Sequence, residues 1–243
     1  MAITSTASMT VSIVVPCYNE KDNIPLILKR FAHVIGDRPI EVILVDNGST
    51  DGSAKVFEEL VPQYPFARCV TVPVNQGYGY GIVSGLRQAN GDYIGWTHAD
   101  MQTDPNDVAR AYDILIQESH QNIYLKGQRK KRPIIDQFFT VGMSFYETVY
   151  LGTPLWDINA QPNLFPKSFF DSIKVFPDDF SLDLYMYYMA RERDLTIKRF
   201  DVLFTARIHG QSKWNDQTFK AKQKFIKRTL EFSKGVKHGI YKP

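Results

Sequence analysis

The sequence predicts an α/β protein built on one mainly parallel, Rossmann-like sheet with helices on both faces. Short apolar, β-prone runs alternate with amphipathic helical stretches over roughly the first half of the 243 residues. The runs have the length of buried strands and are bounded by Pro, Gly, Asn or Asp. Such an alternation implies crossover connections, which place helices on both faces of a parallel sheet.

Each element follows from its local pattern. Residues 21–35 carry apolar side chains at intervals of three and four, which is the spacing of a helix that buries one face. Asp104 and Pro105 have the residue types of an N-cap and a first helical residue. The expected strands are residues 11–15, 40–45, 67–72, 92–97 and 122–126, and the expected helices are residues 21–35, 53–60, 78–89 and 104–118.

The alternation ends after residue 127. We expect a basic loop that ends near Arg132, then an aromatic-rich helix over residues 134–151. The further expected elements are extended pieces over 157–165, a helix over 181–193, a strand over 195–205 and a Lys-rich helix over 216–234. No Ser/Gly-rich linker separates the halves, which favours a single domain over residues 1–243.

Composition narrows the class of protein. A formal net charge of +3 gives no nucleic-acid footprint. Two cysteines, Cys17 and Cys69, are too few for a disulfide framework, so we expect buried thiols and a reducing, cytoplasmic compartment. No stretch of about 20 uninterrupted apolar residues is present, so no membrane span is expected.

Three polar loops follow predicted strands, at residues 16–20, 46–51 and 98–102. The carboxyl ends of parallel strands share one edge, so these loops should converge on one crevice. His98, Asp100 and Gln102 alternate at the end of the fourth strand and can carry metal or phosphate chemistry. Asp46 is a candidate acceptor of hydrogen bonds from a base or ribose, although an Asx-turn before Gly48 is the alternative.

A glycine-rich run, residues 75–81, precedes the third expected helix. Its glycines would let the backbone approach a ligand closely. The spacing is not that of the dinucleotide-binding fingerprint, and a tight turn with close helix packing is the alternative.

Four of these segments together resemble, in order and spacing, the successive motifs of family 2 inverting glycosyltransferases with the GT-A fold. They are Val11–Glu20, Asp46–Gly52, Asn75–Gly79 and His98–Asp100. The resemblance implies a nucleotide-diphosphate sugar, GDP- or UDP-linked, bound by residues 1–126. The donor-binding residues that it implies are Pro16, Tyr18, Glu20, Asp46, Asn75, Gly79 and His98.

The family also implies a divalent metal at an Asp-x-Asp motif, and this chain has His98-Ala99-Asp100 there. The implied metal ligands are Asp100, Gln102 and His98. An imidazole suits Mn²⁺ better than Mg²⁺, which prefers hard oxygen ligands, so Mn²⁺ is slightly favoured. Direct contact of His98 with phosphate or sugar stays open.

The second half of the chain, after residue 127, indicates what kind of molecule accepts the sugar. A basic run precedes an aromatic helix that is apolar on more than one side, which fits an interfacial element at a membrane surface. One flank carries Phe138, Phe145 and Val149, and another carries Phe139, Met143 and Tyr150. A solvated charged face and an ordinary core helix are the alternatives. The Lys-rich stretch from Lys220 to Lys242 would add attraction to anionic lipid, or form a solvated helix face.

This half resembles the polyprenyl-phosphate branch of the family, similar to dolichyl-phosphate mannose synthase. The resemblance implies that Arg129 and Arg132 bind a lipid phosphate. It implies that Arg207, Ser212 and Lys213, in an Arg-x-x-Gly-x-Ser-Lys segment, close over the donor diphosphate. Asp183 falls where the family has a late active-site acid, although a first-turn Asp is also favoured by the helix dipole.

The expected function is inverting transfer of a sugar to a polyprenyl-phosphate lipid by an enzyme peripheral on the cytoplasmic face of a membrane. The expected catalytic residues are Asp183, Asp100, Arg207 and Lys213. A transferase acting on a glycan or protein hydroxyl, and a non-catalytic sugar-nucleotide-binding module, are the alternatives. A nucleotidyltransferase is disfavoured because no basic, Gly-rich phosphate loop lies near the N-terminus.

Overall fold

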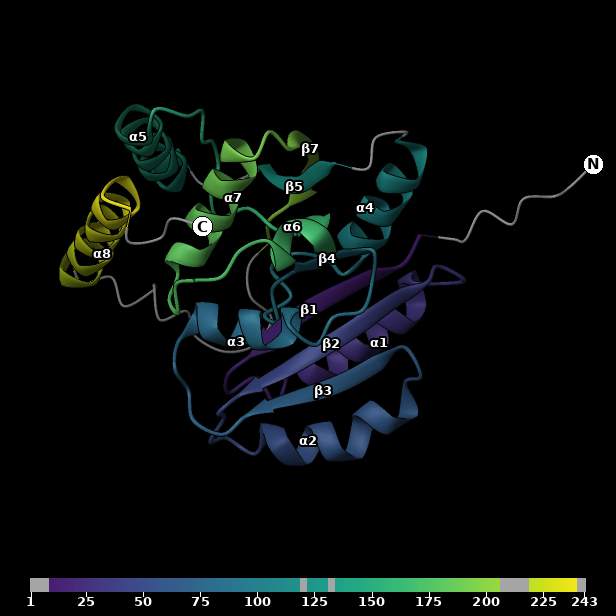
Figure 1. Cartoon of the computed structure of the whole chain (residues 1–243). Coiled ribbons are helices and arrows are strands. Elements are labelled where there is room, and N and C mark those ends of the chain that lie inside the picture. Colours follow the sequence, from purple (N-terminus) through teal and green to yellow (C-terminus); the bar gives the residue numbers. More distant parts are fainter. Residues whose placement is uncertain (1–8, 119–121, 131–133, 206–218, 240–243) are drawn as a thin grey trace, which may run out of the picture.

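The computed structural model has a central seven-stranded sheet with helices on both faces (Figure 1). It describes residues 9–118, 122–130, 134–205 and 219–239, and the side chains of 9–118, 122–130, 141–205 and 227–239. The strand order is β3-β2-β1-β4-β6-β5-β7, in which β6 is antiparallel to both neighbours and all other pairs are parallel. The expected mainly parallel α/β sheet is therefore confirmed.

The elements agree in kind and order with those expected. The strands are β1 Val11–Cys17, β2 Ile40–Asn47, β3 Ala67–Val72, β4 Tyr93–Trp96, β5 Ile123–Lys130, β6 Asn163–Pro166 and β7 Thr196–Leu203. The helices are α1 Ile24–Val34, α2 Ser53–Leu60, α3 Tyr78–Leu86, α4 Asn106–Gln117, α5 Ile134–Leu151, α6 Lys167–Asp171, α7 Ser181–Glu192 and α8 Phe219–Lys237, with a 3₁₀ turn at Val61–Gln63. The short α6 and the 3₁₀ turn were not expected.

The basic segment after residue 126 is a correction to the sequence analysis. The expected loop is strand as far as Lys130, because β7 pairs with β5 over its whole length, from Ile123 against Thr196 to Lys130 against Leu203. The extended stretch expected over 157–165 is strand only from Asn163 onward. Long-range pairing decided both boundaries.

Two other local predictions need adjustment. Helix α4 begins at Asn106, so Pro105 is the N-cap and Asp104, the expected cap, lies one residue earlier, where its Oδ1 accepts the Asn106 N–H at 2.8 Å. Cys17 is buried as expected, whereas Cys69 is only partly buried.

Two apolar clusters lie on opposite faces of the sheet. Helices α1, α2 and α4 cover one face, where Phe31, Phe57 and Val108 are buried. Helices α3, α6 and α7 cover the other face, and α8 adds Phe232 and Val236 at its margin. Burial on both faces explains why the strands read as continuous apolar runs.

Strand β6 enters between β4 and β5 because glycine faces it on both sides. A Cβ on Gly95 would lie 1.8 Å from the Asn163 carbonyl oxygen, and a Cβ on Gly127 would lie 2.2 Å from that of Gln161. The Gly127 N–H donates to the Pro162 carbonyl at 2.9 Å. These contacts fix the place of Asn163 in the sheet.

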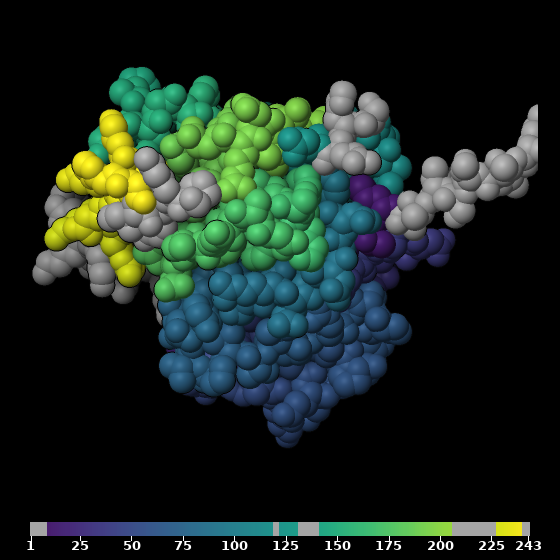
Figure 2. Space-filling view, in the orientation of Figure 1, coloured from purple at the N-terminus to yellow at the C-terminus, as the bar shows by residue number. Residues whose placement is uncertain are grey.

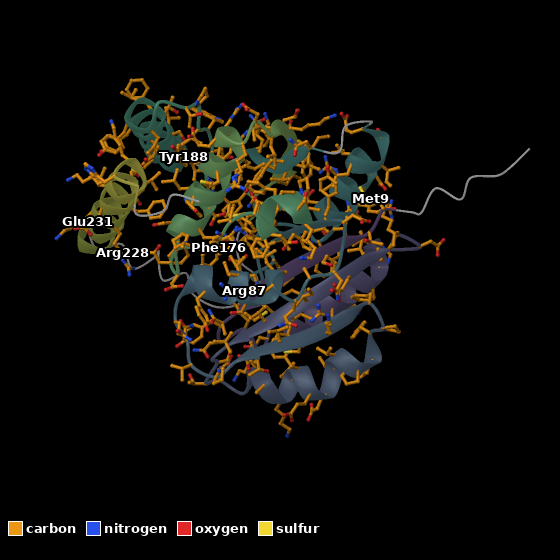
Figure 3. The ribbon with its side chains drawn as sticks, viewed as in Figure 1. Met9, Arg87, Phe176, Tyr188, Arg228 and Glu231 are labelled. Atoms are coloured by element: carbon orange, nitrogen blue, oxygen red, sulfur yellow. The ribbon has the colours of Figure 1, made fainter. Side chains whose placement is uncertain are left out.

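Helices α5 and α8 pack together at one end of the molecule, the upper left corner in Figures 1 and 2. The Ser233 hydroxyl on α8 donates to Glu147 Oε2 on α5 at 2.6 Å. Figure 3 shows Tyr188 between α7 and α5, and Glu231 on the outer side of α8. Within the described ranges, no helix has the length and apolar character needed to cross a membrane.

Candidate active site

The first two polar loops interlock at the carboxyl edge of the sheet. The Asn19 N–H donates to Ser49 Oγ at 3.1 Å, and the Thr50 N–H donates to Asn19 Oδ1 at 2.8 Å. Asn19 adopts a positive φ of 59°, which lets the loop turn back toward its neighbour. Pro16, Tyr18 and Glu20 are half-buried in and beside the first loop. The expected convergence of these two loops is therefore present.

Asp46 lies at this junction and is only 4% exposed. Its Oδ1 accepts the Ser49 N–H at 3.0 Å, one residue beyond the partner of an Asx-turn, so the carboxylate is bound within its own loop. This hydrogen bond holds the carboxylate next to the Asn19 contacts and does not test its role toward a donor, which stays a prediction.

The glycine-rich run packs against backbone. Gly77 has a φ of +127°, and a Cβ there would lie 2.2 Å from the Asp178 carbonyl oxygen. A Cβ on Gly79 would lie 2.3 Å from the Pro177 carbonyl oxygen, and the Tyr80 N–H donates to the Asp178 carbonyl at 3.0 Å. Close packing of α3 against the segment that leads into α7 accounts for these glycines. Asn75 accepts the Gly77 N–H at 3.0 Å, and the donor-binding roles of Asn75 and Gly79 remain predictions.

The third loop is tied to the end of β7. Asp100 is 4% exposed, and its Oδ1 accepts the Gln102 N–H at 3.0 Å. The Gln102 side-chain amide donates to the Thr205 carbonyl at 3.2 Å, and the Thr205 N–H donates to the Gln102 carbonyl at 2.9 Å. The His98 ring lies 6.3 Å from the ring of Phe204, centroid to centroid. The structure thus brings His98, Asp100 and Gln102 beside the strand that precedes Arg207.

The donor set of this loop is compatible with a divalent cation that takes further ligands from a bound diphosphate. Asp100 offers a carboxylate, Gln102 an amide oxygen and His98 an imidazole. In the part of the chain that the structure describes, no three His, Cys, Asp or Glu side chains gather into a metal-binding group. Gln102 and ligand oxygens would therefore be needed to complete a coordination shell.

Arg129 and Asp157 form a buried ion pair between β5 and the segment after α5. Asp157 accepts the Arg129 N–H at 2.9 Å and Nε–H at 2.8 Å, and it also accepts a bond from Nη2. Burial raises the pKa of Asp157, but Arg129 more than offsets this and the pKa lies below its usual value. The Arg129 guanidinium also lies 5.5 Å from the centroid of the Phe204 ring. Its expected role toward a lipid phosphate stays a prediction.

Four of the expected site residues lie outside the described residues: Arg132, Arg207, Ser212 and Lys213. The same holds for the side chains of Phe138 and Phe139.

Asp183 lies in the first turn of α7, 2% exposed, and its Oδ1 has no hydrogen-bond partner. Burial raises the pKa of its carboxyl group. Tyr78, at the start of α3, stacks on Phe180 with ring centroids 4.6 Å apart and accepts a 2.6 Å hydrogen bond from the Gln161 amide. Phe180 is the N-cap of α7, three residues before Asp183, so this stacking joins the start of the helix that carries the expected acid to the glycine-rich run.

Sequence reasoning placed Lys126 in the expected strand over residues 122–126 but gave its side chain no role in the site. It is fully buried in β5, and its Nζ donates to the Ala160 carbonyl and to Asn163 Oδ1, both at 2.7 Å. A signal was available, because Lys126 directly follows the apolar run Ile123–Leu125 and so continues a buried strand.

The outer flank of α5 is apolar and exposed. Phe145 is 70% exposed and Val149 is 66% exposed, and they occupy one flank as expected. On another side, Tyr150 stacks on Tyr146 with centroids 5.6 Å apart and lies 4.7 Å from Lys237 Nζ.

Converging polar loops at the carboxyl edge of a mainly parallel sheet, with helices on both faces, define a GT-A type of α/β fold. The family model described as glycosyl transferase family 2 matches residues 12–157. The chain therefore belongs to glycosyl transferase family 2, and the expected family and fold are confirmed.

Two curated relatives share the name undecaprenyl-phosphate 4-deoxy-4-formamido-L-arabinose transferase. The protein of that name from Photorhabdus laumondii subsp. laumondii is 34% identical over 124 residues, covering 49% of this chain and 37% of the relative. The one from Edwardsiella ictaluri is 33% identical over 134 residues, covering 50% of this chain and 41% of the relative. The matched part of the chain spans about two fifths of these relatives.

Solved structures share the fold at low sequence identity. Glucosyl-3-phosphoglycerate synthase from Mycobacterium tuberculosis, in complex with Mn²⁺, UDP and glucosyl-3-phosphoglycerate, aligns with a TM-score of 0.71 and 18% identity, over 95% of this chain and 80% of that chain. The mannosyltransferase PcManGT from Pyrobaculum calidifontis, in complex with GDP-Man and Mn²⁺, aligns with a TM-score of 0.63 and 21% identity, over 84% of this chain and 59% of that chain.

Proposed function

We propose that this chain transfers a sugar, with inversion, from a nucleotide-diphosphate sugar to a polyprenyl-phosphate lipid at a membrane surface. The observation that carries the proposal is the set of loops at the carboxyl edge, in which Asn19 and Ser49 interlock and Asp100 lies in a loop bound to the end of β7. Family membership and the names of the curated relatives support the reaction and the lipid acceptor.

The donor would lie across the three loops of the first half. Pro16, Tyr18, Glu20 and Asp46 would surround the base and ribose, and Asn75, Gly79 and His98 would complete the site. The solved relatives that contain UDP or GDP-Man support this arrangement. Residues 127–243 would hold the acceptor within the same domain.

Asp100 and Gln102 would hold a divalent cation, with His98 as a further ligand, and Mn²⁺ is favoured because of the imidazole. When bound, such a cation supplies positive charge against the diphosphate leaving group. Solved relatives that contain Mn²⁺ or Mg²⁺ support a divalent cation at this place. Arg207 and Lys213 would offset more of the same charge, and Ser212 would contact the diphosphate.

The acceptor phosphate is already ionised, so its oxygen would attack the anomeric carbon directly as the bond to the diphosphate breaks. Arg129 and Arg132 would bind that phosphate, because guanidinium groups match phosphate oxygens in pairs. Asp183 would then orient the reacting groups and not remove a proton.

A thermal-shift screen of UDP- and GDP-sugars with Mn²⁺ or Mg²⁺ tests donor binding, since a ligand that binds the folded state raises its melting temperature. We expect one donor class to raise the Tm in the presence of metal. Asp100→Asn should abolish most of this shift, whereas Asp37→Asn, at an exposed turn on the opposite edge, should keep it. The donor proposal fails if no sugar nucleotide shifts the Tm, or if the Asp100 variant responds like the native chain.

A second candidate function is transfer to a glycan or protein hydroxyl, favoured by the buried, unpaired Asp183 Oδ1. A hydroxyl acceptor needs a general base, and a lipid phosphate does not. With a lipid-phosphate acceptor, Asp183→Asn should leave measurable turnover. Near-complete loss of turnover with intact donor binding would instead favour the hydroxyl acceptor.

Steady transfer by the native chain would also exclude a non-catalytic sugar-nucleotide-binding module. The control is the same reaction without added metal, which should be at least tenfold slower.

A further inference from the structure

A row of polar side chains crosses the sheet beneath α7. Trp96 pairs in register with Asn163, Asn163 with Lys126, and Lys126 with Arg199. Residues that face each other in register project to the same side of a sheet, so this row spans four strands on one face. Its neighbours Tyr124 and Phe165 in the sheet and Tyr187 on α7 are aromatic and fully or almost fully buried. A polar row inside an apolar layer calls for a specific reason.

Lys126 is the fully buried cation of the row, with zero exposed area, whereas Arg199 at its end is partly exposed. Two acceptors, the Ala160 carbonyl and Asn163 Oδ1, each 2.7 Å from Nζ, fix its ammonium group. The group lies 5.6 Å from the centroid of the Tyr187 ring, on the helix that carries Asp183. An ammonium has three donors, and these two acceptors account for two of them.

Asp183 is the nearby anion that this cation influences most. Burial raises the pKa of the Asp183 carboxyl, and Lys126 is the strongest influence in the opposite direction. Burial lowers the pKa of Lys126 to about 7, and Asp183 is the strongest influence that raises it. Each charge therefore favours the ionised form of the other.

The groups around the pair come from every neighbouring element. Asp183 is faced by Tyr78 of α3, Trp96 of β4, and Lys126 and Arg129 of β5. On its other sides Lys126 is faced by Arg199 of β7 and by Asp157. Arg199 opposes the charge of Lys126, whereas Asp157 is already engaged by Arg129. Asp183 is thus the carboxylate left for Lys126 to balance.

We infer that Lys126 is a positioning residue: its ammonium, held by Asn163 and Ala160 over the ring of Tyr187, is the buried countercharge of Asp183, which lies one helical turn before Tyr187 on the same side of α7. Tyr78 lies in the glycine-rich run and Trp96 lies two residues before His98, so Asp183, which both residues face, lies under the junction of the polar loops. This inference rests on the proposed function for the reaction that Asp183 serves. The electrostatic coupling itself can be measured without that reaction.

The first test is a double-mutant cycle of Lys126→Met, Asp183→Asn and the double variant, measured by urea unfolding at pH 7. We expect the double variant to be more stable than the two single effects predict, by at least tenfold in the unfolding equilibrium constant. Lys174→Met, an exposed lysine, should show no such coupling. If the change in the unfolding equilibrium constant of the double variant equals the product of the two single changes, the inference is overturned.

The second test uses transfer of a hexose from UDP- or GDP-hexose to a short-chain polyprenyl phosphate. Lys126→Met should lower kcat at least tenfold with KM for the donor within twofold, and should move the acid limb of the kcat profile to higher pH. In the Asp183→Asn background the same change should lower kcat less than threefold. An unmoved pH profile with native kcat would overturn the positioning role.

Folding failure is also informative. If Lys126→Met does not fold but Lys126→Met/Asp183→Asn does, an uncompensated Asp183 is the cause and the inference stands. If neither variant folds, Asn163→Ala is the deciding variant, because it removes one acceptor of Lys126 Nζ. An acid limb of its kcat profile unchanged from that of the native chain would overturn the positioning role of Lys126. If the native chain transfers no sugar, the proposed function fails and the unfolding cycle still judges the coupling.

Discussion

At the scale of single residues, the ionised groups of the site are held by specific partners. Arg129 and Asp157 share three hydrogen bonds, and their side chains are only 9% and 6% exposed. Removing one partner of a buried ion pair strongly destabilises the fold, because the other charge is left buried without compensation. The pair therefore fixes where β5 and the segment after α5 meet.

We predict that Asp157→Asn lowers the free energy of unfolding at pH 7 by about 3 kcal/mol, as measured by urea denaturation. The native pKa of Asp157 is depressed, so its contribution is present above the unfolded pKa of about 3.9 and is lost as the pH falls through the folded pKa. The matched control is Asp201→Asn, whose exposed pair with Lys130 should contribute less than about 1 kcal/mol. Equal losses in both variants would contradict the buried-pair argument.

At the scale of elements, the insertion of β6 depends on the absence of side chains at its neighbours. A Cβ on Gly95 would meet the Asn163 carbonyl oxygen and carbon and the Leu164 Cα, all of which are backbone atoms. Backbone of a central strand cannot move aside as a flexible side chain does, so the cost falls on the sheet itself.

We predict that Gly95→Ala lowers the free energy of unfolding by about 3 kcal/mol or prevents folding, through this overlap. Gly142→Ala is the matched control, because a Cβ there meets nothing within 4 Å and alanine is the better helix former by about 1 kcal/mol. Thermal denaturation of the two variants should move in opposite directions. A Gly95→Ala variant with native stability would refute the account of how β6 is seated.

The contact between α5 and α8 has a titratable group at its centre. Glu147 has zero exposed area, its Oε2 accepts the Ser233 hydroxyl, and its Oε1 has no hydrogen-bond partner. Burial raises the pKa of Glu147 to about 7, and the Ser233 bond opposes this. The folded chain thus holds this proton to higher pH than the unfolded chain does.

Ionisation of Glu147 therefore reduces the free energy of unfolding as the pH rises from about 4.3, the pKa of glutamate in the unfolded chain, through about 7. We predict that Glu147→Gln flattens this part of the stability profile and raises the free energy of unfolding at pH 8 by about 1–3 kcal/mol. Urea unfolding between pH 5 and 8 measures both effects. Parallel profiles for the variant and the native chain would show that Glu147 is not the group responsible.

At the scale of the whole molecule, α5 carries an exposed apolar flank and packs against α8, which is rich in lysine. Val141, Phe145 and Val149 are spaced four apart on α5, and Lys227 and Lys234 lie on α8. Apolar residues beside basic ones favour adsorption to an anionic lipid surface. This corner of the molecule is the part that we propose faces the membrane (Figure 2).

We predict that flotation with vesicles containing anionic lipid recovers the native chain and that Phe145→Ser/Val149→Ser lowers recovery at least fivefold. Two buried anchors of this kind contribute about 1.5–3 kcal/mol each when fully inserted. Ile116→Ser, an exposed apolar change on α4, is the control and should float like the native chain. Native recovery of the double variant would exclude this flank as the membrane contact.

Much of the fold was accessible from local pattern. The strand over residues 67–72 and the helices over 53–60 and 134–151 have the predicted bounds, because their apolar periodicity is strong and unambiguous. The boundary errors arose where distant chain segments decide, as at β5, which β7 extends to Lys130. The interlocked first two loops were also predictable, since parallel strands bring their carboxyl ends to one edge.

The sequence by itself determined the α/β class, the family and the loops that meet at the sheet edge, because these depend on short-range periodicity and on contiguous motifs. Only the tertiary structure decided which charges are buried and paired. Lys126 and Asn163 are 37 residues apart and meet through the register of β5 and β6, and Arg129 and Asp157 are 28 apart and meet where β5 passes the segment after α5. A local pattern cannot separate a solvated lysine from a buried one, since that difference is made by the strands and helices packed around it.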